Sequence, residues 1–175
     1  MTPRDLLAEA IEKCKPLAGR YLAGFSDADH TAQAAGLPNH VAWSLGHCAL
    51  TMHRVAEMVD ASAPPAADFG AAAPGRGDRP SGFGPETVAF GSRPLADPAA
   101  YPPLARCVEI YNSACDRLAA AAHTASDAKF NAVIKWGPVE APWWTLAFRM
   151  IFHNGFHTGQ IADLRRAFGF KSIMS

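Results

Sequence analysis

The chain has 175 residues, 16 acidic and 16 basic side chains, and a formal net charge of zero. This length suits one domain with a full hydrophobic core and is too short for two domains of ordinary size. The balanced charge argues against a nucleic-acid-binding protein, because proteins that bind the phosphate backbone usually have an excess of basic residues.

No apolar run reaches the length of a membrane-spanning helix, so no membrane partner is expected. The first residues enter a helical pattern directly and lack the basic-then-apolar order of a signal peptide. The cysteines show no CxxC spacing, which makes a disulfide framework improbable. We therefore expect a cytoplasmic protein with four reduced, mostly buried thiols, at Cys14, Cys48, Cys107 and Cys115.

The first predicted helix runs from Thr2 to about Gly24. Thr2 can cap it, Pro3 suits its first position, and apolar side chains recur behind them at helical spacing. Pro16 must kink this helix or split it, because its ring displaces the carbonyl group one turn earlier.

The second predicted helix runs from about His40 to Val59. Its apolar surface is wide, which suits a helix that packs on more than one neighbour. One face carries Trp43, His47, Leu50, Arg54 and Met58.

Between Ala61 and Pro103 the composition changes, since nine of the 14 prolines and six of the 14 glycines fall there. Neither a long helix nor a central strand can persist in such a segment. It is predicted to be one long crossover loop with short turns. Loops of this length are usually functional, so it is expected either to cover the end of the bundle or to contact a second subunit.

The third predicted helix spans about Leu104 to His123, and the fourth begins near Pro142 and ends at Gly169. The connection between them shows no convincing pair of strands. In the last helix, apolar and histidine positions alternate in steps of four and three, as in the seam of a helix bundle. The predicted fold is therefore all-α: a single domain over residues 1–175, built as a four-helix bundle with one long crossover loop at about 61–103.

Two histidines stand four residues apart in the last predicted helix, at His153 and His157, and Gln160 follows. Side chains four residues apart in a helix project side by side, so both imidazoles can coordinate one metal ion. An isolated HxxxH is weak evidence, because a buried histidine more often binds a backbone carbonyl group. His47 strengthens the case, since it lies on the inward face of the second helix. Three such histidines form a His₃ site that leaves positions for water or substrate.

Four further residues are predicted to surround this site. Gln160 either orients a ligand or is an ordinary surface amide of the helix. Trp43 is a core residue or the wall of a pocket, and Thr51 and Arg54 lie further along the helix that carries His47. No catalytic residue can be named.

Residues 39–47 (NHVAWSLGH) and 153–161 (HNGFHTGQI) resemble the DinB-like superfamily of four-helix-bundle metalloproteins. The resemblance implies that His47, His153 and His157 form the metal triad, with Zn²⁺ or Ni²⁺ commonly bound. It also implies frequent homodimers. Similar members with known chemistry use a low-molecular-weight thiol such as bacillithiol or mycothiol. The proline-rich insertion departs from the compact family pattern.

Three functions follow from such a site. A His₃ ion keeps its full double charge and favours ionisation of a bound water or thiol. Hydrolysis usually needs a carboxylate or histidine nearby, and neither Glu57 nor Asp163 is convincingly placed. We therefore expect a thiol-dependent S-transferase that acts on a small molecule. The alternatives are a metal-dependent hydrolase and a non-catalytic metal-binding or stress-response bundle, whose crossover loop would carry the binding surface. A further alternative is a plain helical bundle whose histidines bind no metal.

Overall fold

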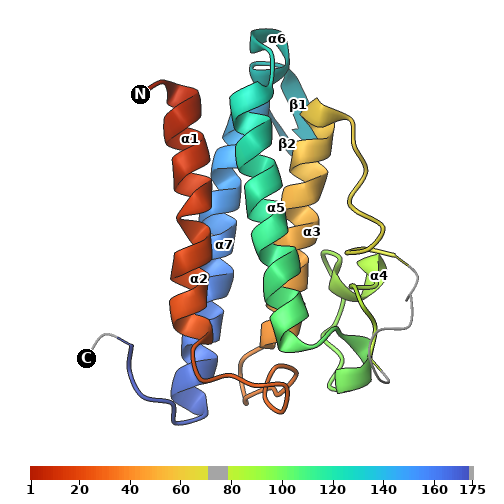
Figure 1. Cartoon of the computed structure of the whole chain (residues 1–175), viewed down its shortest axis with the longest axis vertical. Coiled ribbons are helices and arrows are strands. Elements are labelled where there is room, and N and C mark those ends of the chain that lie inside the picture. Colours follow the sequence, from red (N-terminus) through yellow and green to blue (C-terminus); the bar gives the residue numbers. More distant parts are fainter. Residues whose placement is uncertain (71–78, 174–175) are drawn as a thin grey trace.

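The computed structural model describes residues 1–70 and 79–173. Its long helices are α3 (Val41–Asp60), α5 (Leu104–Thr124) and α7 (Trp143–Ala167), while α1 (Pro3–Glu12) and α2 (Cys14–Leu22) follow each other as one further rod. Figure 1 shows these rods lying side by side. Helix α3 packs on α5 and α7, α1 packs on α5, and α2 packs on α7. The predicted all-α fold is confirmed.

The first rod is split where proline predicts it. Thr2 caps α1 in a reciprocal capping box with Asp5, and Pro3 occupies the first turn. Helix α1 ends at Glu12 and α2 begins at Cys14, so Pro16 falls in the first turn of α2. A missing N–H group costs little there, because the first-turn amides have no partner within the helix.

Helix α3 is the most buried element of the described structure. Fifteen of its 20 residues are buried, and His40 caps it by accepting a hydrogen bond from the Trp43 amide at 3.1 Å. The wide apolar surface predicted for this helix has a direct cause. It packs on α5, on α7 and on a short helix from the insertion, α4 (Pro85–Val88).

The described part of the insertion after α3 contains α4 and a 3₁₀ turn, η1 (Pro98–Ala100). Its apolar side chains Phe83 and Val88 are fully buried. They press on Gly46, where an added Cβ atom would lie 2.7 Å from the Phe83 ring and 2.8 Å from Val88 Cγ1. Helix α4 lies against the flank of α3 (Figure 1). Contact of this segment with a second subunit stays a prediction.

The connection between α5 and α7 contains a short helix, α6 (Asp127–Phe130), and two strands, β1 (Val133–Trp136) and β2 (Val139–Pro142). The strands pair antiparallel, with Val133 opposite Pro142 and Trp136 opposite Val139. The expectation of no strand pair is therefore wrong. Each strand has only four residues, too few for an alternating pattern to be recognised, and Gly137 supplies the turn with a positive φ of 59°.

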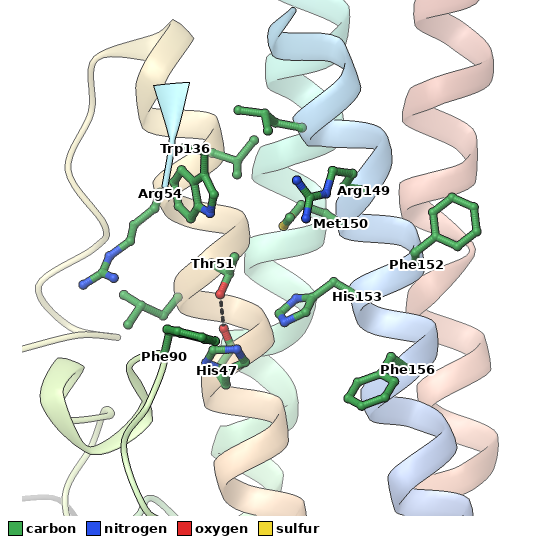
Figure 2. Close-up of a pocket in the computed structure, with 13 residues that line it drawn as sticks. His47, Thr51, Arg54, Phe90, Trp136, Arg149, Met150, Phe152, His153 and Phe156 are labelled. Carbon is green, nitrogen blue, oxygen red and sulfur yellow. Dashed lines mark hydrogen bonds between the residues drawn. The ribbon is translucent and has the colours of Figure 1, made fainter. Parts of the chain in front are cut away.

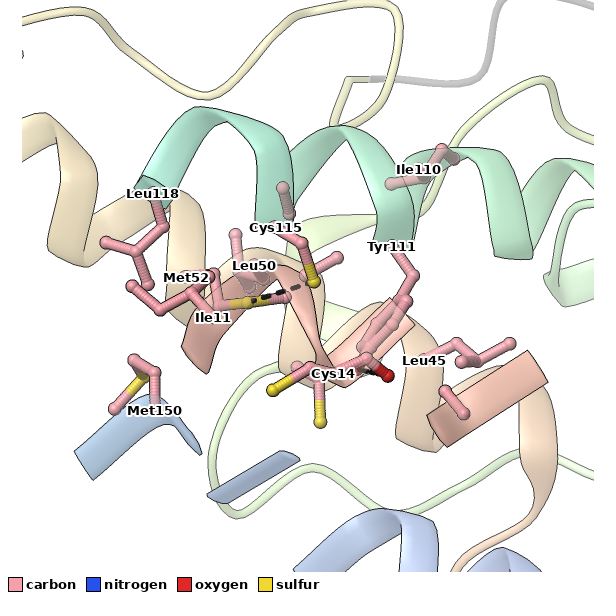
Figure 3. Packing of buried hydrophobic residues seen from close by; sticks show 14 of the residues in the cluster. Ile11, Cys14, Leu45, Leu50, Met52, Ile110, Tyr111, Cys115, Leu118 and Met150 are labelled. Carbon is pink, nitrogen blue, oxygen red and sulfur yellow. Dashed lines mark hydrogen bonds between the residues drawn. The ribbon is translucent and has the colours of Figure 1, made fainter. Parts of the chain in front are cut away.

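The core lies between the rods and is filled by aliphatic and aromatic side chains and by thiols (Figure 3). All four cysteines are buried and free of disulfide bonds, as predicted. Cys115 Sγ lies 3.7 Å from Met52 Sδ, across the contact between α5 and α3. Among the described residues, no helix is both long and apolar enough to cross a membrane.

Candidate metal centre

Three histidines from two helices, α3 and α7, lie close together. His47 comes from α3, and His153 and His157 come from successive turns of α7. One nitrogen of each ring lies within 4.8 Å of a nitrogen of the other two. The ring centroids are 4.7 to 5.2 Å apart, with steep angles of 68° to 90° between the planes. The three imidazole rings are therefore not stacked on one another, and one nitrogen of each is close to the nitrogens of the other two.

The insertion orients His47. Its Nδ1–H donates a hydrogen bond to the carbonyl oxygen of Val88 at 2.8 Å. A carbonyl group can only accept, so this bond places the proton on Nδ1 and leaves the Nε2 lone pair free. A partner on the second nitrogen is typical of metal-binding histidines, because it holds the ring in place and raises its basicity.

His157 is oriented in the same way by a side-chain amide. Its Nδ1–H donates to Gln160 Oε1 at 2.9 Å, and Asn39 Nδ2 donates to the same oxygen at 2.9 Å. The Asn39 contact determines which end of the Gln160 amide faces the ring. His157 Nε2 is therefore unprotonated and faces the centre of the cluster.

The Nε2 atoms of His153 and His157 lie 3.2 Å apart. Two donors bound to one tetrahedral ion at about 2.0–2.1 Å are separated by about 3.3 Å, so this spacing fits a shared ion. His153 Nδ1 is buried and has no partner among the described residues. The cluster found within the described ranges consists of these three side chains, which leaves coordination positions for other ligands.

The electrostatics of the site keep the imidazoles neutral. Burial, reinforced by the neighbouring histidines, lowers the pKa of His153 to about 3 and that of His157 to about 4. Burial also lowers the pKa of His47. Neutral imidazole is the form that binds a metal ion, so the three rings are ready donors at neutral pH.

Two further predicted site residues contact His47 directly. The Trp43 indole stacks on its ring, with centroids 4.6 Å apart and an interplanar angle of 11°. Trp43 Nε1 also donates to Ser92 Oγ at 2.9 Å, a second tie to the insertion. The Thr51 hydroxyl donates to the His47 carbonyl oxygen at 2.7 Å.

A cavity of about 580 Å³ opens beside the histidines (Figure 2). His47 and His153 lie on its wall, together with Thr51 and the predicted Arg54. Most of the other lining side chains are apolar, and in the part of the chain that the structure describes no aspartate or glutamate lines the cavity. Several residues of the lining were not predicted from the sequence as part of the site. These are Phe90, Trp136, Leu146, Arg149, Met150, Phe152 and Phe156.

The remaining histidines have other structural roles. His40 caps α3, and its Nε2 contacts the Leu95 carbonyl oxygen at 3.0 Å. His53 accepts from Arg117 Nη1 at 3.1 Å. Cys48, next to His47 in sequence, is fully buried in the core, and burial raises its pKa well above the ordinary value. It is an apolar packing group.

Comparisons with known proteins bear on the fold and on the family of this chain. A search of curated proteins finds no match. Among solved structures, a crystal structure of a conserved protein from Enterococcus faecalis has the same fold, with a TM-score of 0.71 at 15% identity. The match covers 95% of this chain and 97% of that one. The family model described as the DinB superfamily matches residues 10–161, a span that includes all three histidines, and the chain therefore belongs to the DinB superfamily.

Proposed function

We propose that His47, His153 and His157 hold one divalent transition-metal ion, Zn²⁺ or Ni²⁺, through their Nε2 atoms. The observation that carries this proposal is the convergence of three neutral imidazoles within 4.8 Å beside an open cavity. The donor set also fits, because nitrogen ligands suit zinc and nickel better than magnesium or calcium.

The protein's contribution to chemistry would be orientation and desolvation. Val88 and Gln160 hold two of the imidazoles, and Trp43 covers the ring of His47. When bound, a divalent ion supplies positive charge that favours the ionised form of a thiol or a water molecule. The apolar cavity wall would exclude bulk water from the substrate.

We propose thiol-dependent transfer as the reaction. A thiol loses its proton more readily than water does, so it can react without a general base close by. Because no aspartate or glutamate is among the described residues of the cavity wall, the wall favours this reaction over hydrolysis. The cavity also argues against a purely structural ion, because a closed site would need no such space beside it.

The test uses metal-loaded protein with bacillithiol, mycothiol or glutathione and the electrophile 1-chloro-2,4-dinitrobenzene. In this reaction a carbon–sulfur bond forms, the carbon–chlorine bond breaks, chloride leaves, and the thiol proton passes to solvent. We expect chloride release and thiol loss to require both metal and His157, with His157→Ala as the inactive variant. If none of the three thiols is consumed in a metal-dependent way, thiol transfer is wrong.

We also propose that the partner is a second copy of the chain. Helix α7 exposes aromatic side chains at four-residue spacing, and Phe148, Phe152 and Phe156 are 44%, 67% and 63% exposed. Residues four apart lie on one face, so they form a continuous apolar strip that a monomer would leave in water.

A further inference from the structure

The guanidinium group of Arg149 faces the cavity, and no ion pair of this group is found within residues 1–70 and 79–173. Arg149 lies in α7 one turn before His153, and both side chains line the cavity. Figure 2 shows its guanidinium group directed towards Trp136, on the same side of α7 as the His153 ring. Among the described residues, no carboxylate lies within ion-pair distance of it.

Other arginines of the chain are placed differently. Arg106 binds the Asp68 carboxylate, and Arg117 binds the Asp60 carboxylate at 2.8 and 2.9 Å. These groups tie the insertion and the end of α3 to α5. Arg149 makes no such tie to another described residue, and it lies on a wall that is otherwise mostly apolar.

The two charged side chains that line the cavity are both positive. Arg54, seven residues after His47, also lines the cavity, although Figure 2 shows its guanidinium group extending away from the histidines. Since the described lining residues include two arginines and no acidic side chain, the lining attracts anions and repels cations.

We propose that the cavity binds an amphiphilic anion, a molecule with an aromatic or branched apolar body and one carboxylate, sulfonate or phosphate group. Arg149 takes the anionic group, since its planar guanidinium matches such oxygens in a two-pronged contact. The apolar body lies against Trp136, Leu146 and Met150. This inference rests on the proposed function, because it describes the substrate or thiol held beside His153.

The geometry limits where that molecule reacts. Arg149 and His153 line the same cavity from successive turns of α7, so an anion held by Arg149 keeps the rest of the molecule in the cavity that His153 faces. Arg149 is therefore a specificity-determining residue that selects molecules with a negative group close to their reactive atom.

The test compares two fluorescent probes that differ by one charged group. The first, 8-anilinonaphthalene-1-sulfonate, carries a sulfonate, and N-phenyl-1-naphthylamine is the same ring system without it. Both are titrated into the wild type, Arg149→Gln, Arg149→Lys and, as a matched control, Arg166→Gln. Arg166 belongs to the same helix but pairs with Asp163, outside the cavity.

We expect Arg149→Gln to weaken sulfonate binding at least about tenfold, as loss of a charge-assisted contact predicts, and to leave neutral-probe binding within about twofold. Arg149→Lys should retain part of the affinity, and Arg166→Gln all of it. Equal losses for both probes, or no loss of sulfonate binding in Arg149→Gln, would overturn the inference.

The same titrations on metal-free protein separate this inference from the proposed function. A dependence on Arg149 that persists without metal supports the anion site even if the metal proposal fails. Sulfonate binding that needs metal and His157 but ignores Arg149 overturns the anion site and leaves the metal proposal standing.

Discussion

The carbonyl oxygen of Val88 accepts a hydrogen bond from His47 Nδ1 at 2.8 Å, across a sequence separation of 41 residues. This contact makes the insertion part of the candidate metal centre. Val88 is fully buried against Gly46, the residue that precedes His47. The segment that departs from the compact family pattern therefore supports the ligand that comes from α3.

Replacing Gly46 with alanine tests this support. The added methyl group would press on Phe83 and Val88, both of them fully buried. Overpacking of this kind costs about 1–3 kcal/mol, and the higher helix propensity of alanine offsets about 0.5–1 kcal/mol of it. The free energy of unfolding in urea should therefore fall by up to about 2.5 kcal/mol. Metal affinity should fall as well, because the Val88 carbonyl group has to move.

The matched control is Gly19→Ala in α2, where an added Cβ would meet nothing within 4 Å. Alanine is the better helix former, so this variant should gain roughly 0.5–1 kcal/mol and keep its metal affinity. Equal stability of both variants would show that the insertion does not press on α3.

Replacing Gln160 with leucine tests the support of His157. Leucine removes the oxygen that accepts from His157 Nδ1, while its volume is similar. Loss of such a partner typically lowers metal affinity about 10- to 100-fold, which competition with a chelating dye can measure. Gln160→Glu keeps the acceptor and should bind metal at least as well as the wild type. Unchanged affinity in Gln160→Leu would mean that the amide has no role in the site.

His40 makes stability depend on pH. Its buried ring accepts from the Trp43 amide through Nδ1, and burial lowers its pKa to about 4. The unfolded chain then binds a proton below about pH 6.5 while the folded chain does not, so the free energy of unfolding should fall as pH drops from about 7 to 4. Protonation of His40 Nδ1 would also remove the acceptor of the Trp43 amide and place two N–H groups against each other.

His40→Asn preserves a cap on α3 and removes the titration. Urea denaturation between pH 4 and pH 7 should therefore show a shallower loss of stability in this variant than in the wild type. Identical pH profiles would contradict the assignment.

The proposed homodimer predicts that Phe148→Asp dissociates the protein. Phe148 lies on the exposed strip of α7 but does not line the cavity, so metal binding should survive. Leu6→Asp, at an exposed leucine of α1, is the matched control and should leave the sedimentation coefficient unchanged. A monomeric wild type, or a Phe148→Asp variant that stays dimeric, would rule out this face.

The residues that the sequence predicts well are those whose relations are local. His153 and His157 are one turn apart, so the period of the helix alone brings them together. His47 faces inward because apolar neighbours determine which side of α3 is buried. The split at Pro16 follows equally from local chemistry.

The supporting contacts of the site could not be predicted, because they join distant segments that show no periodicity. Val88 lies in a proline-rich stretch, and Asn39 is 121 residues from Gln160. Trp136 reaches the cavity from a hairpin whose strands are too short to recognise. Arg149 is the exception, since its position one turn before His153 could have placed it beside the site.

The most direct test of the metal centre is elemental analysis of protein purified without a histidine tag and dialysed against Zn²⁺ or Ni²⁺. The wild type, His47→Ala and His157→Ala are compared with His123→Ala, whose ring is half exposed and outside the cluster. Loss of one of three ligands should lower occupancy at least about tenfold with helicity retained, while His123→Ala binds like the wild type. A wild type that retains no ion, or triad variants that retain as much as the wild type, would contradict the account.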